Sequence, residues 1–251
     1  MSDKKSIDKA DTVDKSEIKK FEAMANEWWD EEGKFKPLHR LNPTRIEYIV
    51  NNATQHFGKT NEQKPLAGLT LLDVGCGGGL LSEPMARLGA QVTAIDASEK
   101  NINIASLHAK KSGLDITYMP ITTETLVKQH AQFDIVLNME VVEHVADIAL
   151  YMQEVCALVK PSGLLFNATL NRTLKSYLFA IIGAEYVLRW LPMGTHDWQK
   201  FVKPSELSAQ IEANGLRVKE ILGMTFNPLN QGWSISDNLD VNYLLLAQQR
   251  D

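Results

Sequence analysis

The sequence predicts an α/β protein in which a mostly parallel sheet carries helices on both faces and an antiparallel strand at one edge. Short apolar segments typical of buried strands alternate with segments whose apolar residues recur every three to four positions. This alternation is characteristic of a parallel sheet built from strand–helix units. With 251 residues, the chain is long enough for one such domain with a large core.

Seven strands are expected in all, and helices separate the first five of them. These five strands are predicted at residues 70–75, 91–96, 116–121, 133–139 and 163–170. Helices are predicted at residues 81–88, 98–112, 123–129, 146–158 and 203–215. The last helix ends on Gly215, a residue type that readily adopts the left-handed conformation found at helix ends. Residues 217–228 and 241–249 have no helix between them, so they predict an antiparallel pair at the sheet edge.

The chain is expected to hold one domain with two additions. Residues 1–15 are polar and charged and predict a disordered tail, and residues 16–251 predict a single domain. Residues 16–57 are expected to form an N-terminal helical cap, and residues 170–197 an insertion that acts as a lid or contacts a membrane.

Local signals set the expected helices of the cap. Ser16 is the predicted N-cap of a helix with one apolar face. A second helix is predicted to begin after Asn42-Pro43, because proline is favoured in the first helical turn. Trp28 and Trp29 are expected to pack either in the core or in an apolar lid.

The composition is that of an ordinary globular protein, with 44% hydrophobic and 23% charged residues. The net charge of −5 argues against a nucleic-acid partner, because such proteins usually present a basic surface. The N-terminus lacks the apolar core of a secretory signal, and no stretch reaches the roughly 20 apolar residues of a membrane span. A cytoplasmic location is therefore expected. Cys76 and Cys156 are predicted to be free thiols in a reducing compartment.

The glycine-rich segment 73–79, DVGCGGG, carries the strongest functional signal. It follows a predicted strand and opens a helix, at the edge of the sheet where parallel α/β proteins bind ligands. Glycine allows a ligand to approach the main chain closely. Asp96 lies 21 positions after Gly75, at the end of the next strand, where a carboxylate can accept both hydroxyls of a ribose.

Three interpretations of this segment compete. It could be a structural turn only, a dinucleotide site, or a site for a nucleoside cofactor without a diphosphate. A dinucleotide site favours a third glycine at position 80, where this chain has Leu80. S-adenosylmethionine is therefore the favoured ligand, and Asp73 is placed to orient the loop or to contact a cationic ligand.

The segments LDVGCGGG and VTAID resemble the first two motifs of the class I S-adenosylmethionine-dependent methyltransferases, which have a Rossmann-like sheet. Four further segments narrow the resemblance to the ubiquinone biosynthesis O-methyltransferases: WWDEEGKFKPLHRLNPTRIEYI, MEVVEHV, TLNRTLKSYLFAIIGAEYVLRWLPMGTHDW and DVNYLL. The similarity covers nearly all of the chain after residue 16. It implies O-methylation of polyprenyl catechol or hydroxyphenol intermediates, at two steps of ubiquinone synthesis.

The resemblance also implies contacts with the cofactor from Arg45, Gly75, Asp96 and Met139. For Arg45, the residues alone favour a surface ion pair, for example with Glu47. Many class I enzymes bind adenine with an acid after the third strand, whereas this chain has two threonines and a glutamate at 122–124. The expected cofactor site comprises Arg45, Asp73, Gly75, Gly77, Asp96, Ala97, Thr123 and Met139.

A second polar cluster, Glu140, Glu143 and His144, follows the fourth predicted strand. Two carboxylates and an imidazole predict a Mg²⁺ site, and the resemblance implies a magnesium requirement. Alternatively, His144 acts as a general base without a metal, or the cluster is structural. In either catalytic interpretation, these three residues are the expected catalytic group, because a phenol near pKa 10 must lose its proton to attack a methyl group.

The apolar segment 174–192 is long for a connection and is interrupted by Glu185 and Arg189. It predicts either a lid packed on the domain or a segment that touches a membrane and admits a lipid tail. The expected partners are a polyprenyl phenol, the surface of the inner membrane and a complex of ubiquinone-biosynthesis enzymes. The alternatives are a methyltransferase for another small phenol, a nicotinamide-dependent oxidoreductase and an inactive cofactor-binding module.

Overall fold

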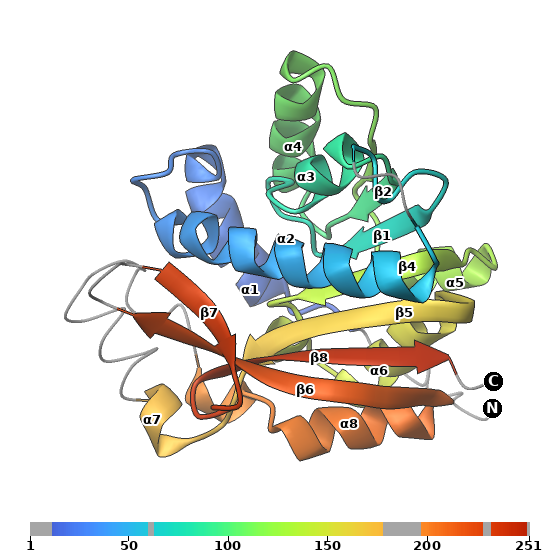
Figure 1. Cartoon of the computed structure of the whole chain (residues 1–251). Helices are drawn as coiled ribbons and strands as arrows, with labels where there is room; N and C mark the ends of the chain where they lie inside the picture. The colour runs from blue at the N-terminus through green and yellow to red at the C-terminus, as the bar shows by residue number, and fades with distance from the viewer. Residues whose placement is uncertain (1–11, 60–62, 178–196, 228–231, 250–251) are drawn as a thin grey trace, which may run out of the picture.

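A computed structural model describes residues 12–59, 63–177, 197–227 and 232–249 of the chain. These residues form one eight-stranded sheet in the order β3-β2-β1-β4-β5-β8-β6-β7 (Figure 1). Strands β1 to β5 run parallel, β8 runs antiparallel to both β5 and β6, and β7 runs antiparallel to β6. The strands are β1 (Thr70–Val74), β2 (Gln91–Ile95), β3 (Thr117–Met119), β4 (Phe133–Met139), β5 (Val159–Leu170), β6 (Leu216–Asn227), β7 (Gly232–Ser236) and β8 (Asn242–Gln249).

Helices cover both faces of this sheet. The α-helices are α1 (Lys15–Met24), α2 (Lys36–His56), α3 (Ser82–Arg87), α4 (Glu99–Lys111), α5 (Thr123–Lys128), α6 (Ile148–Ala157), α7 (Leu174–Ser176) and α8 (Pro204–Ala213). Short 3₁₀ helices are η1 (Ala25–Glu27), η2 (Val142–His144) and η4 (Trp198–Lys200).

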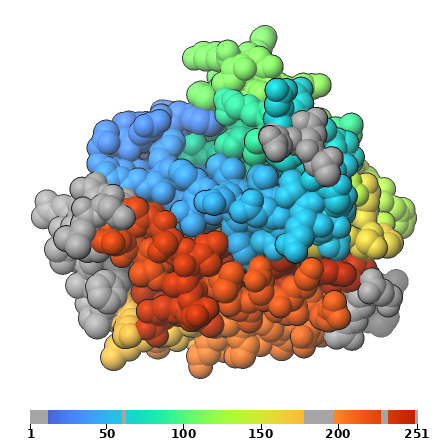
Figure 2. All heavy atoms as spheres, in the orientation of Figure 1, coloured from blue at the N-terminus to red at the C-terminus, as the bar shows by residue number. Residues whose placement is uncertain are grey.

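Alternate residues of the central strands point into two cores, as the two-residue repeat of a strand requires. Leu71 belongs to the core under α2, α3 and α4, whereas its neighbour Leu72 belongs to the core under α5, α6 and α8. Helix α2 crosses the face of the sheet, and Figure 2 shows it as a band above the C-terminal strands. Its Thr44 Oγ1 donates to the carbonyl of Trp233 in β7, and its Tyr48 hydroxyl donates to Glu220 in β6.

The predicted Rossmann-like α/β class is confirmed, and the described sheet has one strand more than the seven expected. The extra strand is β7, which pairs with β6; residues 228–231 between them lie outside the described residues. The predicted final pair is confirmed, because β6 and β8 lie side by side and antiparallel. Here β8 occupies the position between β5 and β6.

Two local predictions in the cap are wrong. The first helix is capped by Asp14, whose carboxylate accepts the Ser16 N–H at 2.9 Å, so Ser16 lies inside the helix. The second helix begins at Lys36 and contains Pro43. Pro37 is the proline of the first turn instead. Helix α2 continues through Pro43 although Pro43 has no N–H to donate to the helical hydrogen-bond pattern.

Other predictions fall partly outside the described residues. Of the expected tail, residues 1–11 lie outside them, whereas Val13 forms a bridge to Val145 beside the site. Of the expected insertion 170–197, residues 178–196 lie outside them. No helix in the described ranges is long and apolar enough to cross a membrane.

Candidate active site

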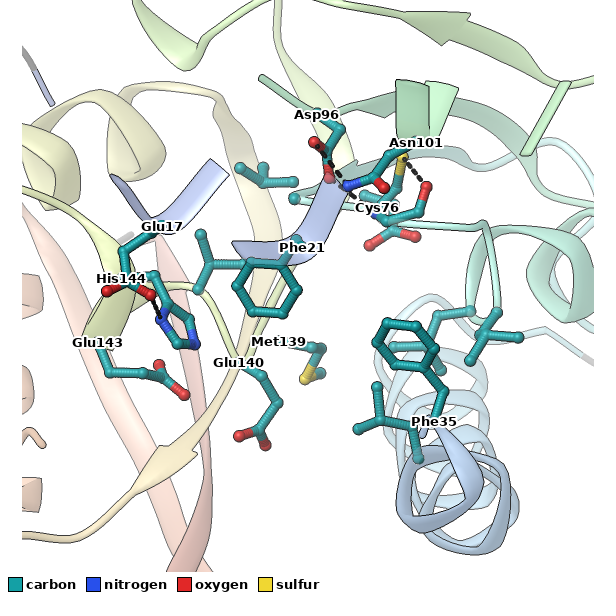
Figure 3. Close-up of a pocket in the computed structure, with 18 of the residues that line it drawn as sticks. Glu17, Phe21, Phe35, Cys76, Asp96, Asn101, Met139, Glu140, Glu143 and His144 are labelled. Atoms are coloured by element: carbon teal, nitrogen blue, oxygen red, sulfur yellow. Dashed lines mark hydrogen bonds and ion pairs between the residues drawn. The ribbon is translucent and has the colours of Figure 1, made fainter. Parts of the chain in front are cut away.

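The carboxyl ends of β1, β2 and β4 open into a cavity of about 770 Å³ (Figure 3). This volume lies within the range typical of small-molecule sites. Helices α1 and α2 close the cavity from the other side. Every residue predicted to bind the cofactor lines it or belongs to its wall: Arg45, Asp73, Gly75, Gly77, Asp96, Ala97, Thr123 and Met139.

The glycine loop and Asp96 form one connected unit. The Asp96 carboxylate accepts the N–H of Gly77 at 2.9 Å and the N–H of Ser98 at 2.8 Å, and the Asn101 side-chain amide lies 3.3 Å away. Gly75 and Gly77 have positive φ values of 66° and 53°, which glycine adopts without strain. The acid expected to hold a ribose is therefore fixed in place by the loop beside it.

Asp73 lies beneath this loop. Its side chain is 3% exposed and accepts the Ser82 hydroxyl at 2.6 Å. Burial raises the pKa of Asp73 to about 7, and the nearby Asp96 charge adds to this effect. Near pH 7, the Asp73 carboxyl is therefore about half protonated, and a cationic ligand would favour its ionised form.

Trp28 explains why the loop needs so many glycines. A Cβ atom on Gly77 or on Gly78 would lie 2.5 or 2.4 Å from the Trp28 side chain. The Trp28 indole is held by a hydrogen bond from Nε1 to Asn101 Oδ1 at 3.0 Å and stacks on Phe35 with centroids 3.6 Å apart. The cap therefore packs directly on bare main chain at the cofactor loop, which settles the place of Trp28 as buried beside the site.

Arg45 is inside the cavity wall and not on the surface. Its side chain is 1% exposed and forms an ion pair with Glu140, so the interpretation as a surface pair with Glu47 is wrong. Glu140 adopts a φ of 57°, which is uncommon for a non-glycine residue, while its N–H donates to Ala168 at 2.8 Å. A backbone conformation of this kind is often found at functional sites.

Glu143 and His144 follow in η2 but make different contacts. Glu143 is 3% exposed and accepts the Thr169 hydroxyl on Oε2 at 2.8 Å. Burial and the neighbouring Glu140 charge raise the pKa of Glu143 well above its ordinary value. The fold therefore favours the neutral form of the Glu143 carboxyl more strongly than water does.

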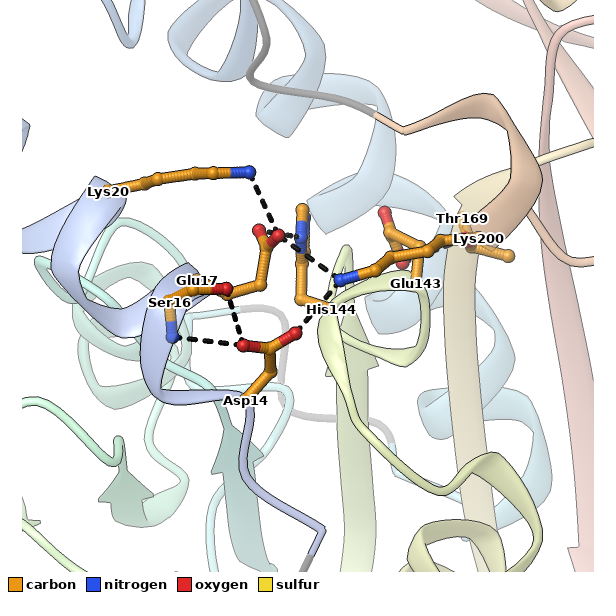
Figure 4. Close-up of polar contacts among 8 residues, drawn as sticks. All are labelled: Asp14, Ser16, Glu17, Lys20, Glu143, His144, Thr169 and Lys200. Carbon is orange, nitrogen blue, oxygen red and sulfur yellow. Dashed lines mark hydrogen bonds and ion pairs between the residues drawn. The ribbon is translucent and has the colours of Figure 1, made fainter.

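His144 is held by a carboxylate from the N-terminal helix (Figure 4). Its Nδ1 lies 3.0 Å from Glu17 Oε2, and Lys20 and Lys200 lie 3.0 and 3.3 Å from Glu17 Oε1. The hydrogen bond from His144, followed by that from Lys20, lowers the pKa of Glu17 to about 2. A charged acceptor at Nδ1 favours the tautomer with its proton there, which makes Nε2 the basic nitrogen.

The predicted metal site is not formed in this arrangement. Glu140 pairs with Arg45, Glu143 with Thr169, and His144 with Glu17. Across the described ranges, no three His, Cys, Asp or Glu side chains gather closely enough to hold a metal ion. The three residues therefore do not fit a Mg²⁺ site in this arrangement.

Several residues of the site were not predicted from the sequence. Glu17 and Asn101 lie on helices far along the chain from the groups they hold. Among the residues that hold the site together, only Trp28 could have been found from the sequence, because it falls within a segment typical of the family that the chain resembles. Cys76 and Cys156 are both buried and free, as expected.

Comparisons with known proteins agree with this geometry. A family model described as a methyltransferase domain matches residues 72–167. A ubiquinone biosynthesis O-methyltransferase from Brucella anthropi is 56% identical over 239 residues, which cover 95% of this chain and 96% of that protein.

Two solved structures show the same fold at low identity. Magnesium protoporphyrin IX methyltransferase from Synechocystis PCC 6803, with bound SAH, has a TM-score of 0.59 at 21% identity and 82% coverage of each chain. A possible histamine N-methyltransferase from Thermotoga maritima has a TM-score of 0.60 at 16% identity, covering 93% of this chain and 100% of its own.

Fold, site and sequence similarity together define an S-adenosylmethionine-dependent methyltransferase with a Rossmann-like sheet. Its identity over almost the full length shows more: the chain belongs to the family of ubiquinone biosynthesis O-methyltransferases. The predicted family, reaction and methyl donor are thereby confirmed. The alternatives of a nicotinamide-dependent oxidoreductase and of an inactive binding module are wrong. Which residues touch the methyl donor stays a prediction.

Proposed function

We propose that this enzyme methylates a hydroxyl of polyprenyl catechol or hydroxyphenol intermediates, at two steps of ubiquinone synthesis. The observation that carries the proposal is a single cavity that contains both the glycine loop and His144. A methyl donor bound at the loop and a phenol beside His144 would therefore share one enclosed space. The chemistry needs this proximity, because the methyl group passes directly from sulfur to oxygen.

The character of the cavity wall supports an apolar, aromatic substrate. Away from the glycine loop, its walls consist mostly of aromatic and aliphatic side chains from α1, α2, β6 and β7. They include Phe21, Phe35, Leu38, Leu41, Met224, Phe226 and Trp233. Such a surface suits a phenol ring and the first units of a prenyl chain.

His144 is the proposed general base. The phenol proton passes to His144 Nε2, since Nδ1 is engaged by Glu17. The phenolate oxygen then forms a bond to the methyl carbon, and the carbon–sulfur bond breaks with its electron pair remaining on sulfur. Figure 3 shows the ring on the cavity wall, with Glu17 on one side and Glu140 and Met139 on the other. Glu17 stabilises the imidazolium formed and is a positioning residue.

A pair of variants tests this mechanism on a prenylated catechol, with S-adenosylhomocysteine formation as the readout. His144→Ala should lower kcat by roughly 10²- to 10⁴-fold. Glu17→Gln should lower it about ten- to a hundredfold, the equivalent of one charge-assisted hydrogen bond. Glu31→Gln, on the exposed surface, is the matched control.

The magnesium requirement stays a prediction, and the same assay addresses it. A rate that persists in EDTA while His144→Ala abolishes it supports the general base. A rate that EDTA abolishes and added Mg²⁺ restores would contradict the metal-free mechanism. It would mean that Glu140, Glu143 and His144 rearrange when substrate binds.

Contact with a membrane is also proposed, since a polyprenyl phenol resides in the bilayer. Leu174 and Tyr177, at the start of the insertion, are 73% and 41% exposed, although both are large apolar residues. Co-sedimentation with anionic liposomes should be strong for the wild type and reduced for Leu174→Ser combined with Tyr177→Ser. Equal sedimentation of the two proteins would contradict this contribution.

A further inference from the structure

Four buried polar atoms that line the cavity have no hydrogen-bond partner among the described residues. They are Asn42 Oδ1, Arg45 Nε, Glu143 Oε1 and Asn242 Oδ1. Their side chains are between 1% and 6% exposed. Buried polar groups are nearly always paired, and leaving one unpaired costs about 1–3 kcal/mol. Four such atoms around one cavity indicate that a ligand supplies the missing partners.

The fold brings these atoms together from distant segments. Asn42 and Arg45 are three positions apart on α2, so they lie on the same face of the helix. Asn242 is the first residue of β8 and pairs with Leu170 at the end of β5. Because β8 runs antiparallel, its start lies at the edge where the parallel strands end. Glu143 reaches the same region through Thr169 of β5.

The chemistry of these atoms restricts the ligand. The two asparagine oxygens accept hydrogen bonds and therefore need O–H or N–H donors, whereas Arg45 Nε needs an acceptor. A prenyl chain offers neither kind of group. A dihydroxylated aromatic ring offers both, because each hydroxyl donates one hydrogen bond and accepts others.

We propose that Asn42 and Asn242 bind the hydroxyls of the phenolic ring that are not being methylated, and so select substrates that carry a second free hydroxyl. This inference rests on the proposed function and deepens it. It places the polar head of the substrate between α2 and β8 and leaves the aromatic and aliphatic walls for the tail.

The test combines residue and substrate changes. Asn42→Leu and Asn242→Leu are compared with wild type on a short-chain prenylated catechol and on its analogue without the second hydroxyl. On the catechol, one or both variants should raise KM about tenfold, the equivalent of one lost hydrogen bond, with little change in kcat. On the analogue, that variant should be no worse than wild type, because the hydroxyl it would bind is missing.

Controls separate this outcome from a folding defect. Calorimetry with S-adenosylhomocysteine should give the same affinity for each variant as for wild type. Asn51→Leu lies on the exposed side of the same helix and should change nothing. If a leucine variant unfolds, the smaller Asn42→Ala and Asn242→Ala changes replace it.

Equal losses on both substrates, or unchanged KM values for both variants, would overturn the inference alone. Calorimetry of catechol binding to the wild-type complex with S-adenosylhomocysteine distinguishes its failure from that of the proposed function. Binding without turnover would contradict the proposed reaction but not the hydroxyl contacts. No binding at all would overturn both.

Discussion

The buried polar groups at the two ends of the cavity differ in whether the fold supplies their hydrogen-bond partners. At the cofactor end, Asp96 already accepts two backbone N–H groups, and Asp73 accepts the Ser82 hydroxyl. At the end between α2 and β8, Asn42 and Asn242 each keep a buried oxygen without a partner in the described structure. Asp73 and Asp96 are therefore already paired within the fold, whereas the hydroxyls of the proposed substrate would supply the partners of Asn42 and Asn242.

This difference follows from how each end is built. The cofactor end comes from one strand–helix–strand unit and the turn after it, residues 70–98, in which nearby backbone N–H groups and the Ser82 hydroxyl supply the donors. The other end joins α2 to β8, about 200 positions later in the chain, and no local backbone reaches its side chains. Preorganised groups suit a cofactor used at every turnover, whereas unpaired groups provide selectivity, since a wrong substrate leaves them unpaired.

The largest expected effect comes from breaking the preorganised end with Gly77→Ala. The new Cβ would lie 2.5 Å from the Trp28 ring, at a φ of 53° that disfavours alanine. Because Trp28 is fixed by Asn101 and Phe35, the loop must move and release Asp96. Affinity for S-adenosylhomocysteine should fall by at least about a hundredfold, the equivalent of roughly 2.7 kcal/mol, as measured by calorimetry.

Gly113→Ala is the matched control for this substitution. Gly113 has a similar φ of 66°, but nothing lies within 4 Å of its added Cβ. Gly113→Ala should therefore cost only about 1–2 kcal/mol of stability, through backbone strain at positive φ, and should keep wild-type cofactor affinity. Equal affinities for the two variants would mean that contact with Trp28 does not shape the loop.

The same contrast explains what the sequence could predict. The strand, loop and Asp96 lie within one short unit with a fixed spacing, so their proximity followed from general rules for parallel sheets. These rules predict the sheet, its helices and the cofactor end of the cavity. They gave no means of pairing Arg45 with Glu140, 95 positions away, or Glu17 with His144, 127 positions away.

The cluster of Glu140, Glu143 and His144 shows a second limit. Its spacing suggested one shared face, but Glu140 takes a left-handed backbone conformation and only residues 142–144 form a 3₁₀ turn. The three side chains therefore point to different partners. The start of α2 and the presence of β7 were predicted wrongly for a related reason. Helix α2 packs across β6 and β7, and this long-range packing outweighs the local helix-start signal of Pro43. The same packing stabilises β7, which is too short to be predicted as a strand from the sequence.

A smaller effect, a dependence on pH, is expected from Asp73 at the cofactor end of the cavity. Its pKa is raised from 3.8 to about 7, so the folded protein holds this proton more tightly than the unfolded chain. The contribution of Asp73 to the free energy of unfolding therefore falls as pH rises from about 4 to about 7. A bound sulfonium favours the ionised carboxylate, so binding should release a proton below pH 7.

Affinity for S-adenosylmethionine should therefore rise by up to about tenfold between pH 6 and pH 8, following ionisation of a group near pH 7. Asp73→Asn should flatten this dependence, and S-adenosylhomocysteine, whose sulfur is neutral, should show less of it. Asp96 also has a pKa raised by burial, and it remains in the variant. A pH dependence that survives Asp73→Asn would therefore assign the proton to Asp96. The cofactor end would then sense the charge of its ligand through the acid at the end of β2 rather than through the one beneath the loop.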